Sequence, residues 1–195
     1  MSNLRNTSED ILLCARGLIV DGGYNGFSYA DISSKVGIRK ASIHHHFPKK
    51  VDLVRTLVAE YRKGAELALG DLDRKIPDPA DQLKAYTDYW AACISDGSRP
   101  ICICALLAVE IPVLPQEVAV EVRGYFRTFS AWLVALMERG AAQGKLALSD
   151  TPQTEAETFI ATVHGAMLSA RAYGNPTVFA SITQPLIERL SAVRH

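Results

Sequence analysis

Three consecutive histidines and a pair of cysteines are the residues of this sequence whose types could do chemistry. His44, His45 and His46 are flanked by basic residues, and Cys102 and Cys104 form a C-x-C arrangement. Imidazole and thiolate groups bind metal ions, and a thiolate is also a nucleophile. The first interpretations to separate are a metal site, a pH-sensitive group and a surface that touches an acidic polymer.

The spacing of these residues argues against a metal site. Neighbouring side chains on a helix point ~100° apart, so three histidines in a row cannot share one ion, whereas residues three or four apart can. C-x-C differs from the C-x-x-C of zinc sites, and no second cysteine pair stands at zinc-ribbon spacing. We therefore expect neither a metal nor another cofactor.

Composition indicates a protein outside the membrane. The chain has 195 residues, of which 48% are hydrophobic and 22% charged, enough for one sizeable core or two modest ones. No apolar run reaches the ~18 residues of a membrane span. The first twenty residues place acids ahead of a broken apolar segment, unlike a secretory signal, so we expect a cytoplasmic protein with no membrane partner and no disulfide framework.

Charge is distributed unevenly although the formal net charge is zero. Residues 1–64 carry ten Lys or Arg and six Asp or Glu, so this part is positive and the remainder negative by the same amount. A basic N-terminal part favours an anionic partner at that end of the molecule.

Apolar spacing of three and four residues recurs along the chain, and strand-like alternation is absent, so the sequence predicts an all-α fold. Thr154 with Glu157 three residues later resembles a capping box. The stretch "KIPDPAD" divides the chain, and we expect an N-terminal domain over 5–65 and a C-terminal domain over 78–195. About nine helices are expected: 6–21, 29–36, 39–47, 49–73, 79–95, 101–112, 115–143, 154–173 and 176–193.

The two short helices at 29–36 and 39–47 have the pattern of a helix-turn-helix. Ser28 and Asp31 can cap the first of them, and Gly37 can end it in the left-handed conformation. Ala30 is small, as a close crossing of the two helices requires. Apolar residues that can face one another are Ile32, Val36, Ile38, Ile43 and Phe47.

The second short helix then exposes side chains suited to DNA. Positive groups meet phosphate, short side chains allow close approach, and hydroxyl or imidazole groups read base edges. Ala41 could contact a thymine methyl group, and Lys40 could reach a guanine. The exposed set is Arg39, Lys40, Ala41, Ser42, His44 and His45, with no acid among them.

The stretch "GFSYADISSKVGIRKASIHHHFPKKVDLV" resembles the DNA-binding domain of the TetR (tetracycline repressor) family of bacterial transcriptional regulators. The matching positions are Gly26, Ile32, Gly37, Ile38, Ile43, His46, Phe47, Lys50 and Leu53.

The resemblance implies a role in DNA binding for several residues. Ser28, Tyr29 and Lys50 match phosphate contacts, and Lys40, Ala41 and Ser42 match positions that read bases. His44 stands where the family usually has a tyrosine against the sugar-phosphate backbone, and an imidazole can donate to phosphate. His44 and His45 either make the affinity for DNA pH-dependent or stay neutral and form hydrogen bonds, and we favour the second alternative.

For the C-terminal domain the resemblance implies dimerisation and ligand binding. Half-sites in successive major grooves lie ~34–36 Å apart, so one chain cannot read both. Small residues in "AETFIATVHGAMLSARAYG" would let the last two helices pack against a second copy. Polar or aromatic residues that could line a pocket for a small, mostly apolar effector are Tyr86, Tyr89, Trp90, Cys102, Cys104, Trp132 and His164, although each aromatic could equally be core.

The stretch "SRPICICALLAVE" resembles the segment in which some relatives carry a cysteine that senses electrophiles. A helix N-terminus and the nearby Arg99 would favour the thiolate of Cys102, which could add to an activated alkene. The alternative is that Cys102 and Cys104 are small buried hydrophobic residues.

We therefore expect a homodimeric repressor that a small molecule releases from a double-stranded DNA operator. A reactive electrophile sensed by Cys102 or Cys104 is one candidate for that molecule. The alternative is a DNA-binding regulator that activates transcription or has no small-molecule ligand. An enzyme that pairs a cysteine nucleophile with His164 lacks a recognisable motif, so we do not expect catalysis.

Overall fold

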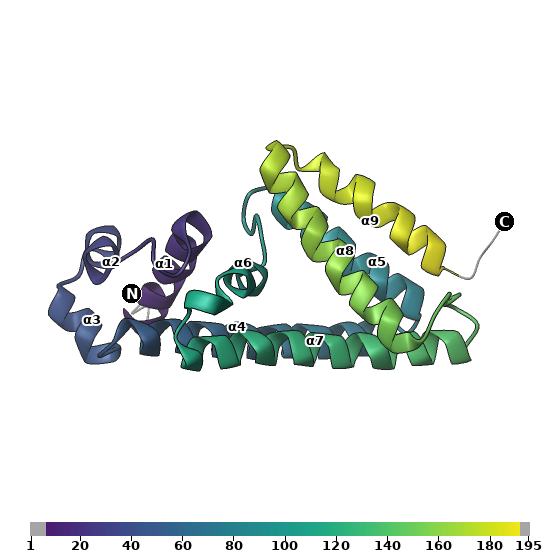
Figure 1. Cartoon of the computed structure of the whole chain (residues 1–195), viewed down its shortest axis with the longest axis horizontal. Helices are drawn as coiled ribbons and strands as arrows, with labels where there is room; N and C mark the ends of the chain where they lie inside the picture. Colours follow the sequence, from purple (N-terminus) through teal and green to yellow (C-terminus); the bar gives the residue numbers. More distant parts are fainter. Residues whose placement is uncertain (1–6, 192–195) are drawn as a thin grey trace, which may run out of the picture. The chain divides into compact units, whose positions relative to one another are not determined.

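The computed structural model describes residues 7–191, and in this range it is all-α, as predicted. Its only β feature there is an isolated bridge between Leu146 and Ser191. No helix in the described range is long and apolar enough to cross a membrane. The helices (Figure 1) are α1 (Thr7–Gly22), α2 (Tyr29–Val36), α3 (Lys40–His46), α4 (Lys50–Lys75), α5 (Pro79–Ser95), α6 (Ile103–Val109), the 3-10 helix η1 (Ile111–Val113), α7 (Gln116–Ala142), α8 (Pro152–Tyr173) and α9 (Thr177–Leu190).

Local sequence signals explain most of these boundaries. Ser28 and Asp31 form the predicted capping box of α2, and Gly37 ends that helix with φ 77°. The predicted helix over 101–112 is interrupted, and η1 with Pro112 in its first turn follows α6. The capping box predicted at Thr154 is wrong: α8 begins two residues earlier, at Pro152, and the Thr151 hydroxyl accepts the Thr154 N–H instead.

Residues 7–63 and 103–125 form one compact unit, called unit 1 below. It therefore includes α6, η1 and the start of α7, which the predicted division of the sequence assigned to the C-terminal domain. The Arg62 guanidinium joins the Glu121 carboxylate at 3.1 Å, which ties α4 to α7 inside this unit. The fully buried core of unit 1 comprises Ile11, Ala15, Ile19, Ile32, Ile43, Leu53, Val54, Val58, Ile103, Cys104, Leu107, Val118 and Val122.

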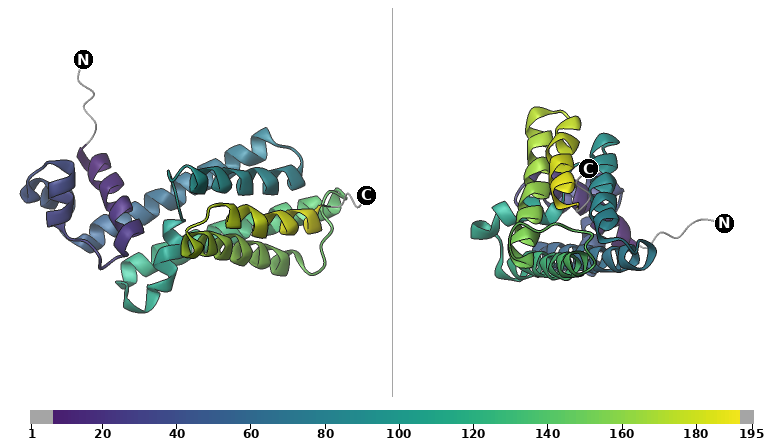
Figure 2. Two further views of the ribbon diagram at one scale, coloured as in Figure 1. Left: turned by 90° about the horizontal axis from the view of Figure 1, so that it is seen from above. Right: turned by 90° about the vertical axis from the view of Figure 1, so that its right-hand side faces the viewer.

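Residues 64–102 and 126–191 form the second compact unit, called unit 2. Its helices α5, α8 and α9 lie side by side, as the views in Figure 2 show. An ion pair between the buried Glu155 and the partly exposed Arg189 fixes the end of α9 to the start of α8. Both guanidinium nitrogens of Arg189 donate to the Glu155 carboxylate, at 2.9 and 2.7 Å, and the Ser149 N–H donates to the same group.

Candidate DNA-binding face and effector site

The core of unit 1 fixes how α2 and α3 present their outer surfaces. Ile32, Ile43 and Phe47 are buried, whereas Val36 and Ile38 are half-buried. The Ser33 hydroxyl donates to the Ile38 carbonyl oxygen at 2.6 Å, which closes the turn between the helices. The expectation that Ala30 lies at a close helix crossing is wrong, because Ala30 is exposed.

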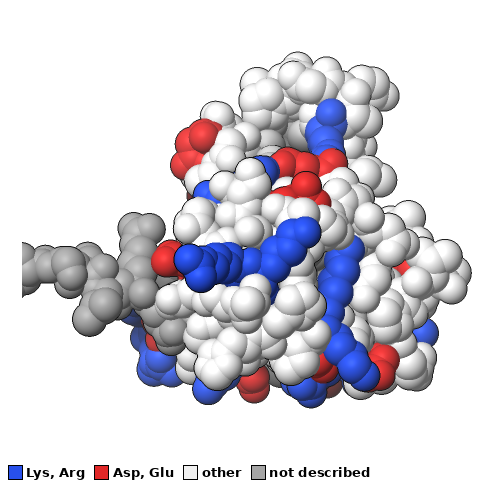
Figure 3. Space-filling model, turned by 90° about the vertical axis from the view of Figure 1, so that its left-hand side faces the viewer, with Lys and Arg blue, Asp and Glu red and all other residues white. Residues whose placement is uncertain are grey.

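The remaining side chains of α3 form an exposed, basic surface. Arg39, Lys40, Ala41, His44 and His45 are exposed and Ser42 is half-buried. No acidic residue occurs between Asp31 and Asp52. The space-filling view onto this end of the chain shows Lys and Arg side chains across its centre (Figure 3). We call the surface formed by 28–30 and 39–46 the recognition face.

Two aromatic residues of the recognition face hold each other in place. The Tyr29 hydroxyl donates to the Phe47 carbonyl oxygen at 2.8 Å, and its ring meets the edge of the His44 ring at 4.8 Å between centroids. Burial, followed by the nearby Asp52 carboxylate, raises the pKa of the Tyr29 phenol to about 12. Tyr29 therefore stays neutral and orients the imidazole beside it.

The orientation of the His44 ring limits what it can do with DNA. Its Nδ1 lies 3.2 Å from the Pro48 carbonyl oxygen, which can only accept, so Nδ1 carries the proton. In the neutral ring Nε2 is then an acceptor, suited to a base amino group. Only the doubly protonated ring can donate from Nε2 to a phosphate.

Part of the hydrogen-bonding capacity of Lys50 is used within unit 1. Its ammonium donates to the Phe27 carbonyl oxygen and lies 4.0 Å from the centroid of the Phe27 ring. Burial lowers the pKa of Lys50, while the Asp31 and Glu110 carboxylates favour its charged form. An ammonium has three protons, so a phosphate contact from Lys50 would use those that Phe27 leaves.

In unit 2, three of the residues expected at an effector site come together. Tyr86 lies 6.4 Å from Trp132 between ring centroids, and Phe129 lies 6.1 Å from Trp132 and 6.3 Å from His164. We call the group Tyr86, Phe126, Phe129, Trp132, Phe159 and His164 the aromatic cluster.

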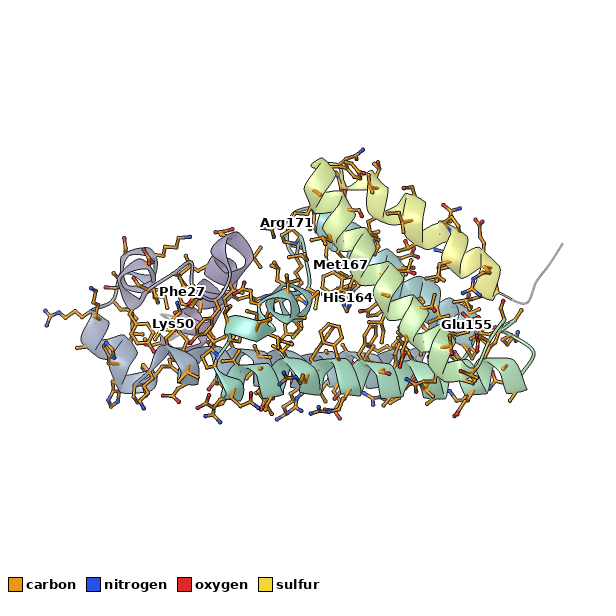
Figure 4. All side chains as sticks on the ribbon, in the orientation of Figure 1. Phe27, Lys50, Glu155, His164, Met167 and Arg171 are labelled. Carbon is orange, nitrogen blue, oxygen red and sulfur yellow. The ribbon has the colours of Figure 1, made fainter. Side chains whose placement is uncertain are left out.

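Polar atoms interrupt this apolar group. The Trp132 indole N–H donates to Asp73 at 3.0 Å, and Asp73 also pairs with Arg139 at 2.8 Å. His164, labelled on α8 in Figure 4, has a buried Nε2 for which the described residues supply no hydrogen-bond partner. The Oε1 of Gln82, one helical turn before Tyr86, is likewise buried and unpaired within the described part of the chain. A buried nitrogen without a partner is costly, and a bound polar group would satisfy it.

The other expected effector residues lie elsewhere. Tyr89 is exposed and its hydroxyl meets the Arg99 guanidinium, whereas Trp90 is buried. Cys102 and Cys104 are both fully buried, and Cys104 belongs to unit 1. Within 7–191 no three His, Cys, Asp or Glu side chains gather as they would around a metal ion.

Sequence reasoning missed part of the aromatic cluster. Phe126, Phe129 and Phe159 carry no local signal, because isolated phenylalanines on amphipathic helices look like ordinary core. Only the packing of α5, α7 and α8 reveals that they meet.

Comparison with known families agrees with this architecture. The family described as "Bacterial regulatory proteins, tetR family" matches residues 11–57, and "Tetracyclin repressor-like, C-terminal domain" matches residues 79–186, more than half of the chain. The chain belongs to the TetR family. It is therefore a DNA-binding transcriptional regulator and not an enzyme, as the sequence predicted.

Several individual relatives resemble this chain in sequence or in structure. A TetR-family regulator of Agrobacterium tumefaciens is 58% identical with a TM-score of 0.94, over 97% of this chain and 100% of that one. A TetR regulator of Legionella pneumophila is 25% identical with a TM-score of 0.87, over 97% and 100%. The HTH-type transcriptional regulator CymR of Pseudomonas putida is 26% identical over 70% of this chain and 68% of its own length.

Proposed function

We propose that this TetR-family regulator is a homodimeric repressor that a small-molecule effector releases from its DNA operator. The observation that carries the proposal is the pairing of an exposed, acid-free recognition face in unit 1 with a partly buried aromatic cluster in unit 2, where the described residues leave the buried Nε2 of His164 without a hydrogen-bond partner. The first feature suits an anionic duplex, and the second suits a small apolar ligand with one polar group.

Contacts to DNA are divided in this proposal between bases and backbone. Lys40, Ala41 and Ser42 read bases, while Ser28, Tyr29 and Arg39 contact phosphates. His44, His45 and Lys50 complete the set at the end of α3 and the start of α4. Exposure of Lys40 and Arg39 supports these roles, since each side chain can reach a groove without unfolding anything.

Dimerisation is proposed through α8 and α9. The outer side of α8 carries small residues together with the exposed Leu168, at 54% accessibility. A Cβ at Gly165 would meet nothing within 4 Å. Gly165→Trp should therefore fold as a single chain but prevent close helix contact between two chains. Light scattering should then find a monomer. A Gly165→Trp variant that remains a dimer would show that α8 is not part of the interface.

The effector is proposed to be a neutral or weakly polar aromatic compound that stacks within the aromatic cluster and forms a hydrogen bond with His164. Reaction of an electrophile with Cys102 or Cys104 is the less favoured route, because both thiols have no exposed surface. A thermal-shift screen of wild type and Cys102→Ser tests both routes. A ligand that binds only the native state raises the melting temperature. Equal shifts in the two proteins favour reversible binding, and shifts by reactive alkenes confined to wild type would establish the cysteine route.

Repression itself is tested in a reporter strain. A binding site is first selected from random duplexes with the purified protein and placed at a reporter promoter. Expression of the regulator should lower reporter output, and a compound found in the screen should restore it. Output that rises with the regulator would identify an activator instead. Repression that no compound relieves would favour a regulator without a ligand.

A further inference from the structure

The turn between α1 and α2 is tight and leads directly into Ser28 and Tyr29 of the recognition face. Gly23 adopts φ 73°, a left-handed conformation that favours glycine, and its carbonyl oxygen accepts the Gly26 N–H at 3.3 Å. A Cβ at Gly26 would lie 2.2 Å from the Gly22 carbonyl oxygen. This turn therefore has little freedom to change shape locally, and what holds it in place also sets the start of α2.

One carboxylate from a distant part of unit 1 holds this turn. Glu110, between α6 and η1, accepts the Tyr24 N–H through Oε2 at 2.9 Å, across 86 residues of sequence. Its Oε1 lies where a side chain at position 23 would begin, 2.1 Å from a Cβ built on Gly23. Glu110 is fixed in turn, because its carbonyl oxygen accepts the N–H groups of Val113 and Leu114 at 2.9 and 3.1 Å.

Lys50 supports the same turn. Its ammonium, bonded to the Phe27 carbonyl oxygen, lies 4.9 Å from the Tyr24 ring centroid and 4.0 Å from that of Phe27. Figure 4 labels Phe27 and Lys50 at this position in unit 1. The turn is therefore held by a carboxylate at one point and an ammonium at another, and α2 leaves it directly.

We propose that Glu110 is a positioning residue for DNA binding, which fixes the α1–α2 turn and thereby the Ser28 and Tyr29 end of the recognition face. Glu110 itself does not touch DNA. Its requirement is reach and an acceptor oxygen for the Tyr24 N–H. The inference relies on the proposed recognition face, so the experiment tests that face separately.

Four variants and a selected duplex separate these roles. Glu110→Gln keeps the reach and an acceptor oxygen, Glu110→Asp keeps the charge but is one methylene too short, and Glu110→Ala removes both. Lys40→Ala removes a cation of the recognition face instead. For each, fluorescence anisotropy measures the dissociation constant for a labelled duplex over a series of salt concentrations, and thermal melting reports folding.

Glu110→Ala and Glu110→Asp should weaken DNA binding about tenfold, which corresponds to ~1.4 kcal/mol. Glu110→Gln should stay within about threefold of wild type. The slope of log affinity against log salt should be unchanged in all three, because no phosphate contact is lost, whereas Lys40→Ala should reduce it by about 1.

Other results overturn the inference. Two results would exclude the proposed positioning role, which depends on side-chain length. One is wild-type DNA affinity in Glu110→Asp, and the other is a Glu110→Gln variant that binds DNA as weakly as Glu110→Asp. A reduced salt slope in the Glu110 variants would make Glu110 part of the electrostatic interface. If Glu110→Ala fails to melt cooperatively, the Gln and Asp pair decides alone. An unchanged Lys40→Ala variant would contradict the recognition face, and with it the inference that relies on that face.

Discussion

In unit 1 the proposed DNA contacts are exposed side chains on two short helices, whereas in unit 2 the proposed effector contacts are largely enclosed side chains from three long ones. Ala41 and His45 are exposed, so each can change without disturbing a core. Phe129 and Phe159 are at most 2% exposed and pack against their neighbours. Substitutions of the exposed residues in unit 1 should therefore change function alone, whereas substitutions of Phe129 or Phe159 in unit 2 should lower stability as well.

The largest expected effect breaks DNA binding alone. Ala41→Asp puts a carboxylate at the centre of the recognition face. There its negative charge would be repelled by the DNA phosphates. Like-charge contacts at an interface cost several kcal/mol, so the dissociation constant for a selected duplex should rise by about 100-fold or more. The melting temperature should not change, because Ala41 is exposed. Ala41→Ser is the matched control. Wild-type affinity in Ala41→Asp would contradict the assignment of α3 to the DNA interface.

A smaller effect should appear as stability in unit 2. Glu155 is 3% exposed and paired with Arg189, so Glu155→Gln leaves the guanidinium with a neutral partner. Because Arg189 is partly exposed, we expect the free energy of unfolding in urea to fall by about 2 kcal/mol, less than for a fully buried pair. The exposed pair of Lys84 and Asp88 provides the control, and Lys84→Gln should change stability by less than ~0.5 kcal/mol.

The same pair gives a pH dependence with a definite sign. The hydrogen bonds from Arg189 lower the pKa of Glu155 below its usual value of 4.5. The stabilisation is therefore complete above that value and is lost as the pH falls through the lower pKa of the folded state. Urea unfolding of wild type and Glu155→Gln should differ most at neutral pH and converge in acid. A difference that grows in acid would contradict this assignment.

A third substitution sharpens the comparison inside the aromatic cluster. His164→Phe removes the Nε2 for which the described residues supply no partner and keeps an aromatic ring, so the unfolding free energy should stay equal or rise by up to ~1 kcal/mol. Binding of an effector found by thermal shift should weaken by about tenfold, the loss of one buried hydrogen bond. His45→Phe on α3 is the control, and it should leave effector binding unchanged. Normal effector binding in His164→Phe would place the ligand elsewhere.

The smallest effect concerns cysteine reactivity and leaves function untouched. Cys14 is half-buried, and burial raises the pKa of its thiol, so it should label slowly with a maleimide. Cys102 and Cys104 should label more slowly still, because they react only when the surrounding structure opens. Mass spectrometry after brief treatment measures the order. Faster labelling of Cys102 would revive the sensor hypothesis.

Much of unit 1 could be predicted from short-range sequence signals. Ser28 with Asp31 and the left-handed Gly37 define α2, and the basic residues after Arg39 define the exposed side of α3. The signals extend over few residues, so their physical meaning does not depend on distant packing. The error at Ala30 arose because a small side chain alone does not show which side of α2 packs inward, and the error at Thr154, in unit 2, arose because Thr151 caps α8 instead.

The candidate effector site was only partly predictable, because its members come from α5, α7 and α8. Tyr86 and Trp132 were expected there and do meet, and His164 joins them through Phe129. Tyr89, by contrast, faces solvent, and Cys104 lies in unit 1. The sequence could not distinguish these cases, since an aromatic or sulfur side chain on an amphipathic helix is compatible with either environment.

The sequence by itself determined the helical composition, the helix-turn-helix and the family, because caps, turns and apolar spacing act within a few residues. Only the tertiary structure decided that α6 joins unit 1, that Glu110 reaches the Tyr24 N–H across 86 residues, and that His164 lies against the phenylalanines of α7. Contacts between residues far apart in the chain depend on how whole helices pack, and no local pattern encodes that packing.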